Sequence, residues 1–243
     1  MNELTASSSD LRGKTAIVTG GASGIGLAIT RGLMASGVDV VITSRRADLL
    51  TETAAELNDE FESNCIGVAA DVRVKAQVQA IVEETLAQYR GVDFLINNSG
   101  LGVTDKVIDC PEANWDLVLE TCTKGTFLMS QAVLPTMQAN RSGFIINIAS
   151  QAAKNGYAEA APYCAAKFGV LGFGLALQEE VREFGIKVHS LCPGLVQVPK
   201  PKVADEMTPG WLQTEDLAAA VLFLLQLPKR VQFDNIGLWG FSN

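Results

Sequence analysis

The stretch of sequence that decides the fold is TAIVTGGASGIGLAIT, residues 15–30. It begins with an apolar, β-branched run typical of a buried strand, passes through a turn with four glycines, and continues with apolar residues at helical spacing. This order places a helix N-terminus, with its unpaired N–H groups, where a phosphate group can approach it. The stretch therefore indicates a phosphate-binding site; a turn that only lets strand and helix pack closely is the alternative.

The same alternation of apolar strand and amphipathic helix continues along the chain. Seven short apolar runs are predicted strands, beginning at Thr15, Val38, Cys65, Val92, Gly143, Ile186 and Asn235. Between them lie segments such as VKAQVQAIVEETLAQY, in which apolar residues recur at intervals of three and four. Nearly continuous apolar strands that alternate with helices predict a parallel sheet covered on both faces. We expect one doubly wound α/β domain of the Rossmann type over residues 13–243, after a flexible leader at residues 1–12.

Composition limits the kinds of partner. The 243-residue chain has a net charge of −8, and its lysines and arginines are dispersed, which argues against a nucleic-acid groove. The opening residues lack the basic and then apolar order of a signal peptide, and no apolar run reaches membrane-spanning length. We expect a cytoplasmic protein that binds small molecules and has neither a nucleic-acid nor a membrane partner.

Cysteine and histidine content argues against two kinds of catalytic site. The five cysteines are odd in number and far apart, which predicts reduced thiols, and no pair has metal-ligand spacing. His189 is the only histidine and lies in a predicted strand. We therefore expect neither a metal site nor a Ser/His/Asp catalytic group.

The residues after the second predicted strand bear on the choice of cofactor. Ser44, Arg45 and Arg46 stand where a protein that binds NAD places an acidic residue against the ribose diol. A carboxylate would repel a 2′-phosphate, whereas guanidinium groups bind one. The sequence therefore favours NADP (NADPH) over NAD; two solvated arginines at the start of a helix are the alternative.

A phenol and an ammonium are paired in PYCAAKFG, where Tyr163 lies four residues before Lys167. Residues four apart share one face of a helix, so the two side chains can meet. Such a pair also occurs by chance on a helix surface, and its meaning depends on motifs elsewhere in the chain.

Those motifs come in a recognisable order. Ser150 follows the fifth predicted strand, thirteen residues before Tyr163, and NNSG follows the fourth. Together with TGGASGIG and YCAAK, they resemble the short-chain dehydrogenase/reductase family, whose signatures are T-G-x-x-x-G-x-G, N-N-A-G and Y-x-x-x-K. The resemblance spans nearly the whole chain and implies hydride transfer between a nicotinamide cofactor and a carbonyl or secondary alcohol.

The resemblance implies a catalytic group of Ser150, Tyr163 and Lys167. Tyr163 would donate a proton to the developing alkoxide of a reduced ketone. Lys167 would favour the phenolate in the reverse reaction and bond the nicotinamide ribose. Ser150 would position the substrate oxygen and stabilise its negative charge.

The glycine-rich turn, the arginines after the second predicted strand and the resemblance together predict a set of cofactor-binding residues. They are Gly20, Ser23, Gly24, Ile25, Gly26, Ser44, Arg45, Arg46, Asp71, Val72, Asn97, Gly100, Tyr163, Lys167, Pro193, Gly194 and Val196. Within this set, Asp71 would accept a hydrogen bond from the adenine amino group, although it could equally cap the following helix.

Two positions depart from the family pattern. Val198 stands where many relatives have a threonine that helps hold the nicotinamide carboxamide. Cys122 stands where an asparagine usually holds a water that relays protons between the lysine and solvent. Because a thiol is a much weaker hydrogen-bonding group, we expect an interrupted relay unless backbone carbonyls, Thr121 or Thr123 hold the water.

The substrate is expected to be a carbonyl compound such as a 3-oxoacyl group or a small ketone. Lys200 and Lys202 could meet an acidic or carrier-bound substrate, although exposed loop lysines are usually solvated. Gln151, Tyr157 and Trp211 are expected walls of the pocket.

Assembly and competing functions complete the expectations. Small residues along the helix from Pro162, with Trp239 and Phe241 near the end of the chain, suit packing between subunits, and the resemblance implies a homodimer or homotetramer. Core packing is the alternative. The competing functions are an NAD-preferring alcohol dehydrogenase of the same family and a weakly catalytic, cofactor-binding regulatory protein.

Overall fold

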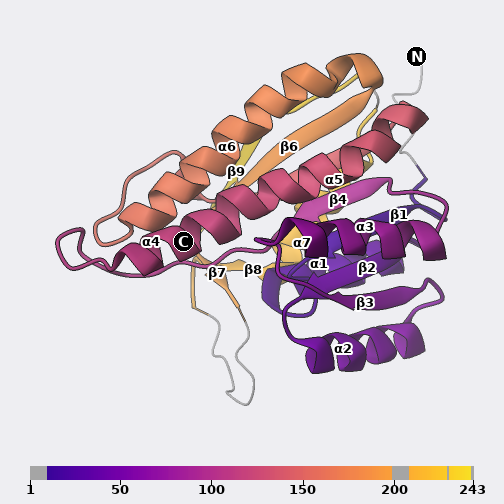
Figure 1. Cartoon of the computed structure of the whole chain (residues 1–243), viewed down its shortest axis with the longest axis horizontal. Coiled ribbons are helices and arrows are strands. Elements are labelled where there is room, and N and C mark those ends of the chain that lie inside the picture. The colour runs from indigo at the N-terminus through magenta and orange to yellow at the C-terminus, as the bar shows by residue number, and fades with distance from the viewer. Residues whose placement is uncertain (1–9, 199–207, 229, 242–243) are drawn as a thin grey trace.

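The computed structural model describes residues 10–198, 208–228 and 230–241. These residues form a seven-stranded parallel sheet in the order β3-β2-β1-β4-β5-β6-β9 (Figure 1). The strands are β1 Thr15–Thr19, β2 Asp39–Ser44, β3 Cys65–Ala69, β4 Phe94–Asn97, β5 Gly143–Ile148, β6 Ile186–Pro193 and β9 Asn235–Leu238. Each begins within about two residues of its predicted start, and the predicted parallel sheet is confirmed.

The chain enters the sheet at its middle strand. β1 pairs with β2 on one side and with β4 on the other, so that Ile17 lies opposite both Val41 and Leu95. The strand order therefore reverses between β1 and β4, and in open α/β sheets a ligand crevice lies at this reversal, beyond the carboxyl ends of the strands. The glycine-rich turn and the NNSG motif both lie at this crevice, because one follows β1 and the other begins at the end of β4.

Helices cover both faces of the sheet (Figure 1). The first layer consists of α1 Gly24–Ala35, α2 Ala47–Glu60 and α7 Thr214–Leu225; the second consists of α3 Lys75–Gln88, α5 Gly125–Asn140 and α6 Ala161–Val181. Alternate residues of β1 serve the two layers, since Ala16 and Val18 pack with the first and Ile17 with the second. Removing these apolar side chains from water fixes the helices against the sheet, and the predicted doubly wound fold is confirmed.

One helix changes its geometry near the crevice. Helix α4, Glu112–Leu119, passes through a π-helical turn, Glu120–Lys124, before it continues as α5. The sequence did not predict this turn. Such turns are frequent at functional sites, and this one contains Cys122.

Two peripheral segments of the domain differ from the sequence-based prediction. A short parallel ribbon forms from β7 Val196–Gln197 and β8 Leu212–Gln213, and it was not predicted. Leu11 is only 4% exposed and packs with the first helix layer, so the predicted leader is wrong at this residue. Burial of the apolar Leu11 side chain stabilises the fold, which is why this residue packs against the domain. The remaining division of the chain stays a prediction.

Cysteine and histidine side chains are placed as follows. All five cysteines are free. The described ranges contain no group of three or more His, Cys, Asp or Glu side chains that could hold a metal. His189 is buried in β6, where its Nδ1 lies 2.9 Å from the carbonyl oxygen of Phe233 and burial lowers its pKa. Within the part of the chain that the structure describes, no helix has both the length and the apolar character needed to cross a membrane.

Candidate active site

The glycine-rich turn brings the start of α1 close to the end of β1. Gly20 has a φ of +67°, a left-handed conformation that glycine adopts without strain. A Cβ at Gly26 would overlap the carbonyl oxygen of Gly20, so only glycine allows α1 to approach the turn this closely. Gly20, Ser23 and Ile25 line the crevice at the start of α1, and a phosphate-binding role for this turn stays a prediction.

Asn98 ties this turn to the end of β4. Its side-chain amide donates to the carbonyl oxygen of Thr19 at 2.9 Å, and the backbone N–H groups of Asn98 and Ser99 both donate to the Thr19 hydroxyl at 2.9 Å. Thr19 therefore acts as the acceptor that joins the two strand ends. Asn98 also lines the crevice, a position that the sequence analysis did not give it.

Asn97 is a correction to the predicted cofactor set. Its side chain is 4% exposed and donates to Asn147 Oδ1 at 2.9 Å and to Ser130 Oγ at 3.2 Å. Successive side chains of a strand point to opposite faces, so only one of the two neighbouring asparagines can face the crevice. In this chain that residue is Asn98, and Asn97 bonds within the interior.

A groove of about 380 Å³ extends from the glycine-rich turn over the ends of β2 and β3. It brings together many predicted residues: Gly20, Ser23, Ile25, Ser44, Arg45, Arg46, Asp71, Val72 and Gly100. Arg46 reaches across it, with Nη2 donating to Ser23 Oγ at 3.3 Å, and its backbone N–H donates to Ser44 Oγ at 3.2 Å. Two exposed guanidinium groups therefore lie where a bound anion can meet them.

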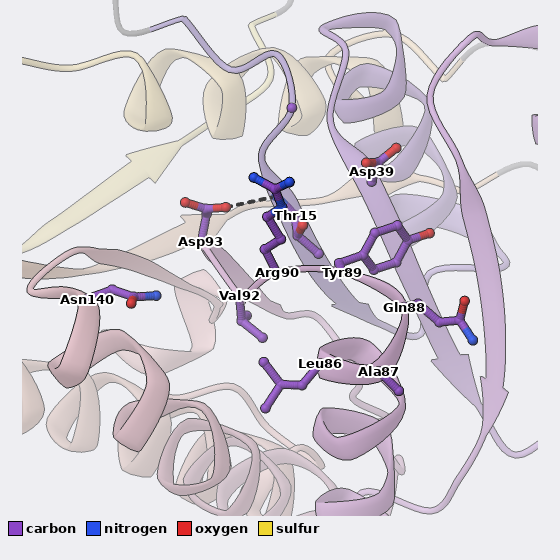
Figure 2. A pocket seen from close by; sticks show the side chains of 12 residues that line it. Thr15, Asp39, Leu86, Ala87, Gln88, Tyr89, Arg90, Val92, Asp93 and Asn140 are labelled. Atoms are coloured by element: carbon purple, nitrogen blue, oxygen red, sulfur yellow. Dashed lines mark hydrogen bonds between the residues drawn. The ribbon is translucent and has the colours of Figure 1, made fainter.

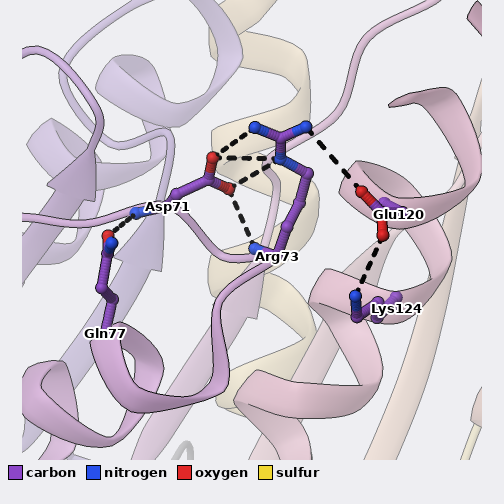
Figure 3. A network of polar contacts seen from close by, with 5 residues as sticks. All are labelled: Asp71, Arg73, Gln77, Glu120 and Lys124. Atoms are coloured by element: carbon purple, nitrogen blue, oxygen red, sulfur yellow. Dashed lines mark hydrogen bonds and ion pairs between the residues drawn. The ribbon is translucent and has the colours of Figure 1, made fainter. Parts of the chain in front are cut away.

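Arg73 belongs to this groove and was missed by the sequence analysis. It pairs with Asp71, and Figure 3 shows the two side chains facing each other between Gln77 and Glu120. The Arg73 side chain holds the pKa of Asp71 below its usual range, although burial opposes this shift. Asp71 also accepts from the backbone N–H of Arg73, in the turn before α3, so it does not act as the N-cap of that helix. The ADVR spacing could have suggested this pairing.

The predicted catalytic residues meet in a second hollow, of about 770 Å³, which adjoins the groove. Tyr163 and Lys167 lie one turn apart on α6, and Ser150 follows β5. Lys167 is 5% exposed, and its Nζ donates to the carbonyl oxygen of Ile148 at 2.8 Å. The same Nζ lies 5.6 Å from the centre of the Tyr163 ring, so the phenol and the ammonium share one pocket.

The remaining lining of this pocket is largely apolar. Its predicted members Ile25, Gly100, Pro193, Gly194 and Val196 are joined by Leu101, Ala149, Ala152, Leu195 and Val198. Gln151 and Tyr157 line the pocket as predicted, whereas Trp211 does not. Trp239 lines the pocket instead of Trp211. Its ring packs beside Gly194, where a Cβ would lie 3.0 Å from it.

Val198 and Cys122, the two departures from the family pattern, both contact segments that border the crevice. Val198 packs over the glycine-rich turn, where a Cβ on Gly24 would lie 3.0 Å from its side chain. Cys122 is 1% exposed, and its thiol donates to the carbonyl oxygen of Leu101 at 3.5 Å. The hydroxyl of Thr123 donates to the carbonyl oxygen of Ala166 at 2.9 Å.

Another hollow, of about 740 Å³, lies at the opposite, amino-terminal ends of the strands (Figure 2). Asp93 there accepts from the ammonium of Lys14 and from the backbone N–H of Thr15, both at 3.0 Å. Asp39 accepts from the backbone N–H of Asn64 at 2.8 Å. These bonds give both carboxylates a part in the fold, and none of the predicted catalytic or cofactor-binding residues lines this hollow.

A crevice that can hold a dinucleotide beside an ionisable pair is typical of enzymes that work on a bound cofactor. The chain belongs to the short chain dehydrogenase family, whose model matches residues 14–208. It is 33% identical to an uncharacterized oxidoreductase of Staphylococcus haemolyticus, over 93% of this chain and 97% of that protein.

Two solved structures are similar throughout. A variant of the actinorhodin polyketide ketoreductase with NADPH has a TM-score of 0.86 and 30% identity, covering 96% of this chain and 98% of that one. L-sorbose reductase of Gluconobacter frateurii, complexed with NADPH and L-sorbose, has a TM-score of 0.87 and 28% identity, with the same coverage. The family resemblance drawn from the sequence motifs is thus confirmed.

Proposed function

We propose that this protein is an NADP-dependent ketoreductase. The observation that carries the proposal is the meeting of Tyr163, Lys167 and Ser150 in one pocket that adjoins the glycine-rich groove. When bound, the reduced cofactor supplies a hydride to the carbonyl carbon. The side chains described here must then position the carbonyl oxygen and provide its proton.

The groove fits a cofactor with a 2′-phosphate. Arg45 and Arg46 follow β2 at a place where an acidic residue would favour the free ribose diol of NAD. The bond from Arg46 to Ser23 shows that its guanidinium reaches the glycine-rich turn. Both similar solved structures contain NADPH, which supports the same choice here.

Tyr163 is the proposed proton donor. Its phenol would protonate the oxygen of the reduced ketone, and the positive charge of Lys167 would stabilise the phenolate that remains. Lys167 is held by Ile148, so this charge has a fixed place. The buried setting strengthens its effect, because less water screens it.

Ser150 is the proposed partner of the substrate oxygen. Its Oγ accepts from the backbone N–H of Ala152 at 3.1 Å. This bond orients the hydroxyl and leaves its proton to be donated to the carbonyl oxygen. Ser150 would therefore hold the substrate rather than act as a nucleophile.

The apolar pocket favours a neutral ketone with a sizeable apolar body, including a 3-oxoacyl group. Leu101, Leu195 and Trp239 offer this ketone contact surface without charge. Lys200 and Lys202, the predicted contacts of an acidic or carrier-bound substrate, lie outside the described residues. The similarity to a polyketide ketoreductase supports the same substrate class.

We also propose a homodimer or homotetramer. The exposed face of α6 carries Ala165, Phe168, Gly172 and Leu175 at helical spacing, and Phe127 of α5 is 42% exposed. An apolar face with small residues permits close packing against a second copy. Sedimentation of the purified protein would measure this assembly directly.

The function is tested by adding NADPH or NADH to purified protein and following cofactor absorbance with ketones of increasing apolar size. We expect NADPH oxidation that is fastest with large apolar ketones and much slower with NADH. Tight NADPH binding without turnover on any ketone would instead favour the cofactor-binding regulatory protein. Equal rates with both cofactors would remove the proposed preference for NADP.

A further inference from the structure

The guanidinium of Arg73 fixes the carboxylate of Asp71 in the cofactor groove. Arg73 Nε lies 3.0 Å from each carboxylate oxygen, and Nη2 lies 2.6 Å from Oδ2. The backbone of Asp71 has a separate partner, since its N–H donates to Gln77 Oε1 at 2.7 Å. The main chain and side chain of Asp71 are therefore held independently, as Figure 3 shows.

Arg73 is itself held on its other side. Its Nη1 lies 3.8 Å from Glu120 Oε2, and Glu120 Oε1 lies 3.0 Å from Lys124 Nζ. Glu120 and Lys124 are the first and last residues of the π-helical turn, so Arg73 spans from the loop after β3 to that turn. A side chain braced at both ends loses little further freedom when a ligand binds next to it.

This pairing resolves an electrostatic conflict. Asp71 is an acidic side chain in the same groove as Arg45 and Arg46, where a bare carboxylate would repel a phosphate. The guanidinium of Arg73 compensates the carboxylate charge. A carboxylate has about four acceptor positions, and Arg73 fills about three of them with its backbone N–H, Nε and Nη2. About one position is therefore left for a hydrogen bond from a ligand.

We propose that Arg73 is a positioning residue for the adenine end of the cofactor. It holds Asp71 as an oriented acceptor for the exocyclic amino group of adenine and compensates the charge of Asp71 beside the cofactor phosphate. The inference rests on the proposed binding of NADPH. Arg73 acts through Asp71, and its loss would change which base the groove prefers.

The test compares NADPH with its hypoxanthine analogue, in which a carbonyl oxygen replaces the adenine amino group, by fluorescence titration. We expect the wild type to bind NADPH about tenfold more tightly than the analogue, the size of one charge-assisted hydrogen bond. Arg73→Gln should reduce this ratio to within about twofold and weaken NADPH binding about tenfold. Arg73→Lys keeps the charge without the two-pronged contact, so it should lose the base preference but keep the preference for NADPH over NADH.

Arg182→Gln is the control, because Arg182 pairs with Glu179 on the exposed surface. This variant should keep both preferences. An Arg73→Gln protein that keeps the wild-type ratio would overturn the inference, as would a wild type that binds NADPH without preferring adenine. If Arg73→Gln melts early, the ratio in Arg73→Lys decides the question. A wild type that binds neither NADPH nor NADH would instead overturn the proposed function.

Discussion

The proposed cofactor groove and the proposed catalytic pocket share Gly100 and Val198 in their linings, yet they carry different kinds of side chain. Arg45 and Arg46 of the groove are exposed, whereas Lys167 of the pocket is 5% exposed among apolar neighbours. Water and salt screen an exposed charge, so the groove needs several guanidinium groups. A buried charge is screened less, so one residue suffices in the pocket. We therefore expect substitutions in the groove to divide the loss of cofactor affinity among several residues. In the pocket, we expect a single substitution to remove most of the activity.

The largest expected effect comes from Tyr163→Phe. The change removes only the phenolic oxygen of the proposed proton donor, so kcat should fall about a thousandfold. The affinity for NADPH should change by less than about twofold, because the groove is untouched. Steady-state kinetics and a fluorescence titration on the same preparation measure both quantities.

Tyr157→Phe is the matched control for that substitution. Tyr157 lines the same pocket, is 48% exposed, and has no assigned part in proton transfer. Its phenylalanine variant should keep kcat within about threefold. If Tyr163→Phe retained comparable activity, the proton would come from another group and the pocket would not depend on one residue.

The sequence predicted those parts of this comparison that depend on local pattern. Strand, glycine turn and helix follow one another along the chain, so residues 15–30 sufficed to predict the crevice. The meeting of Ser150 with Tyr163 was predicted from the family resemblance; in the structure Ser150 follows β5 and Tyr163 lies in the first turn of α6, the next long helix along the chain.

Other parts depend on contacts between distant segments. The assignment of Trp239, in place of Trp211, to the pocket wall requires the packing of the last strand beside Gly194. The π-helical turn depends on a change in backbone hydrogen bonding that no pattern of residues in the sequence predicts. Asn97 and Asn98 were distinguishable in principle, because side-chain parity along β4 sends them to opposite sides.

The double substitution Arg45→Ala with Arg46→Ala tests the shared charge of the groove. Two charge-assisted contacts to a 2′-phosphate would be lost, so NADPH affinity should fall about a hundredfold. NADH affinity should stay within about threefold, because NADH lacks that phosphate. Each single substitution should lower the affinity for NADPH about tenfold. Titrations of both single variants and the double variant with NADPH and NADH measure how the loss is divided between the two arginines.

Arg182→Ala is the control for this double substitution, since it removes a cation from an exposed pair on the surface. It should leave both affinities unchanged. Equal losses of NADPH and NADH in the double variant would show that the two arginines do not recognise the 2′-phosphate.

Trp239→Ala tests the apolar character of the pocket. Removing this ring takes contact surface from the substrate and leaves Tyr163 in place, so KM for large apolar ketones should rise about tenfold. KM for the smallest ketones and kcat should change by less than about twofold. Trp211→Ala is the matched control, because Trp211 is an indole that is 40% exposed and does not line the pocket. If both variants raised KM for large ketones to a similar extent, Trp239 would not be a wall of the substrate pocket.

The smallest effect is expected from Cys122→Asn. Cys122 and Lys167 both border Gly100, but Lys167 is already fixed by Ile148, so its position does not depend on the thiol. We expect kcat to change by less than about threefold, while unfolding free energy falls by about 1–3 kcal/mol because an amide replaces a buried thiol. Cys65→Asn, which buries the same amide in β3, controls for the stability loss. A clear rise in kcat specific to Cys122→Asn would show that proton relay past this position limits turnover, and that the pocket depends on more than its single lysine.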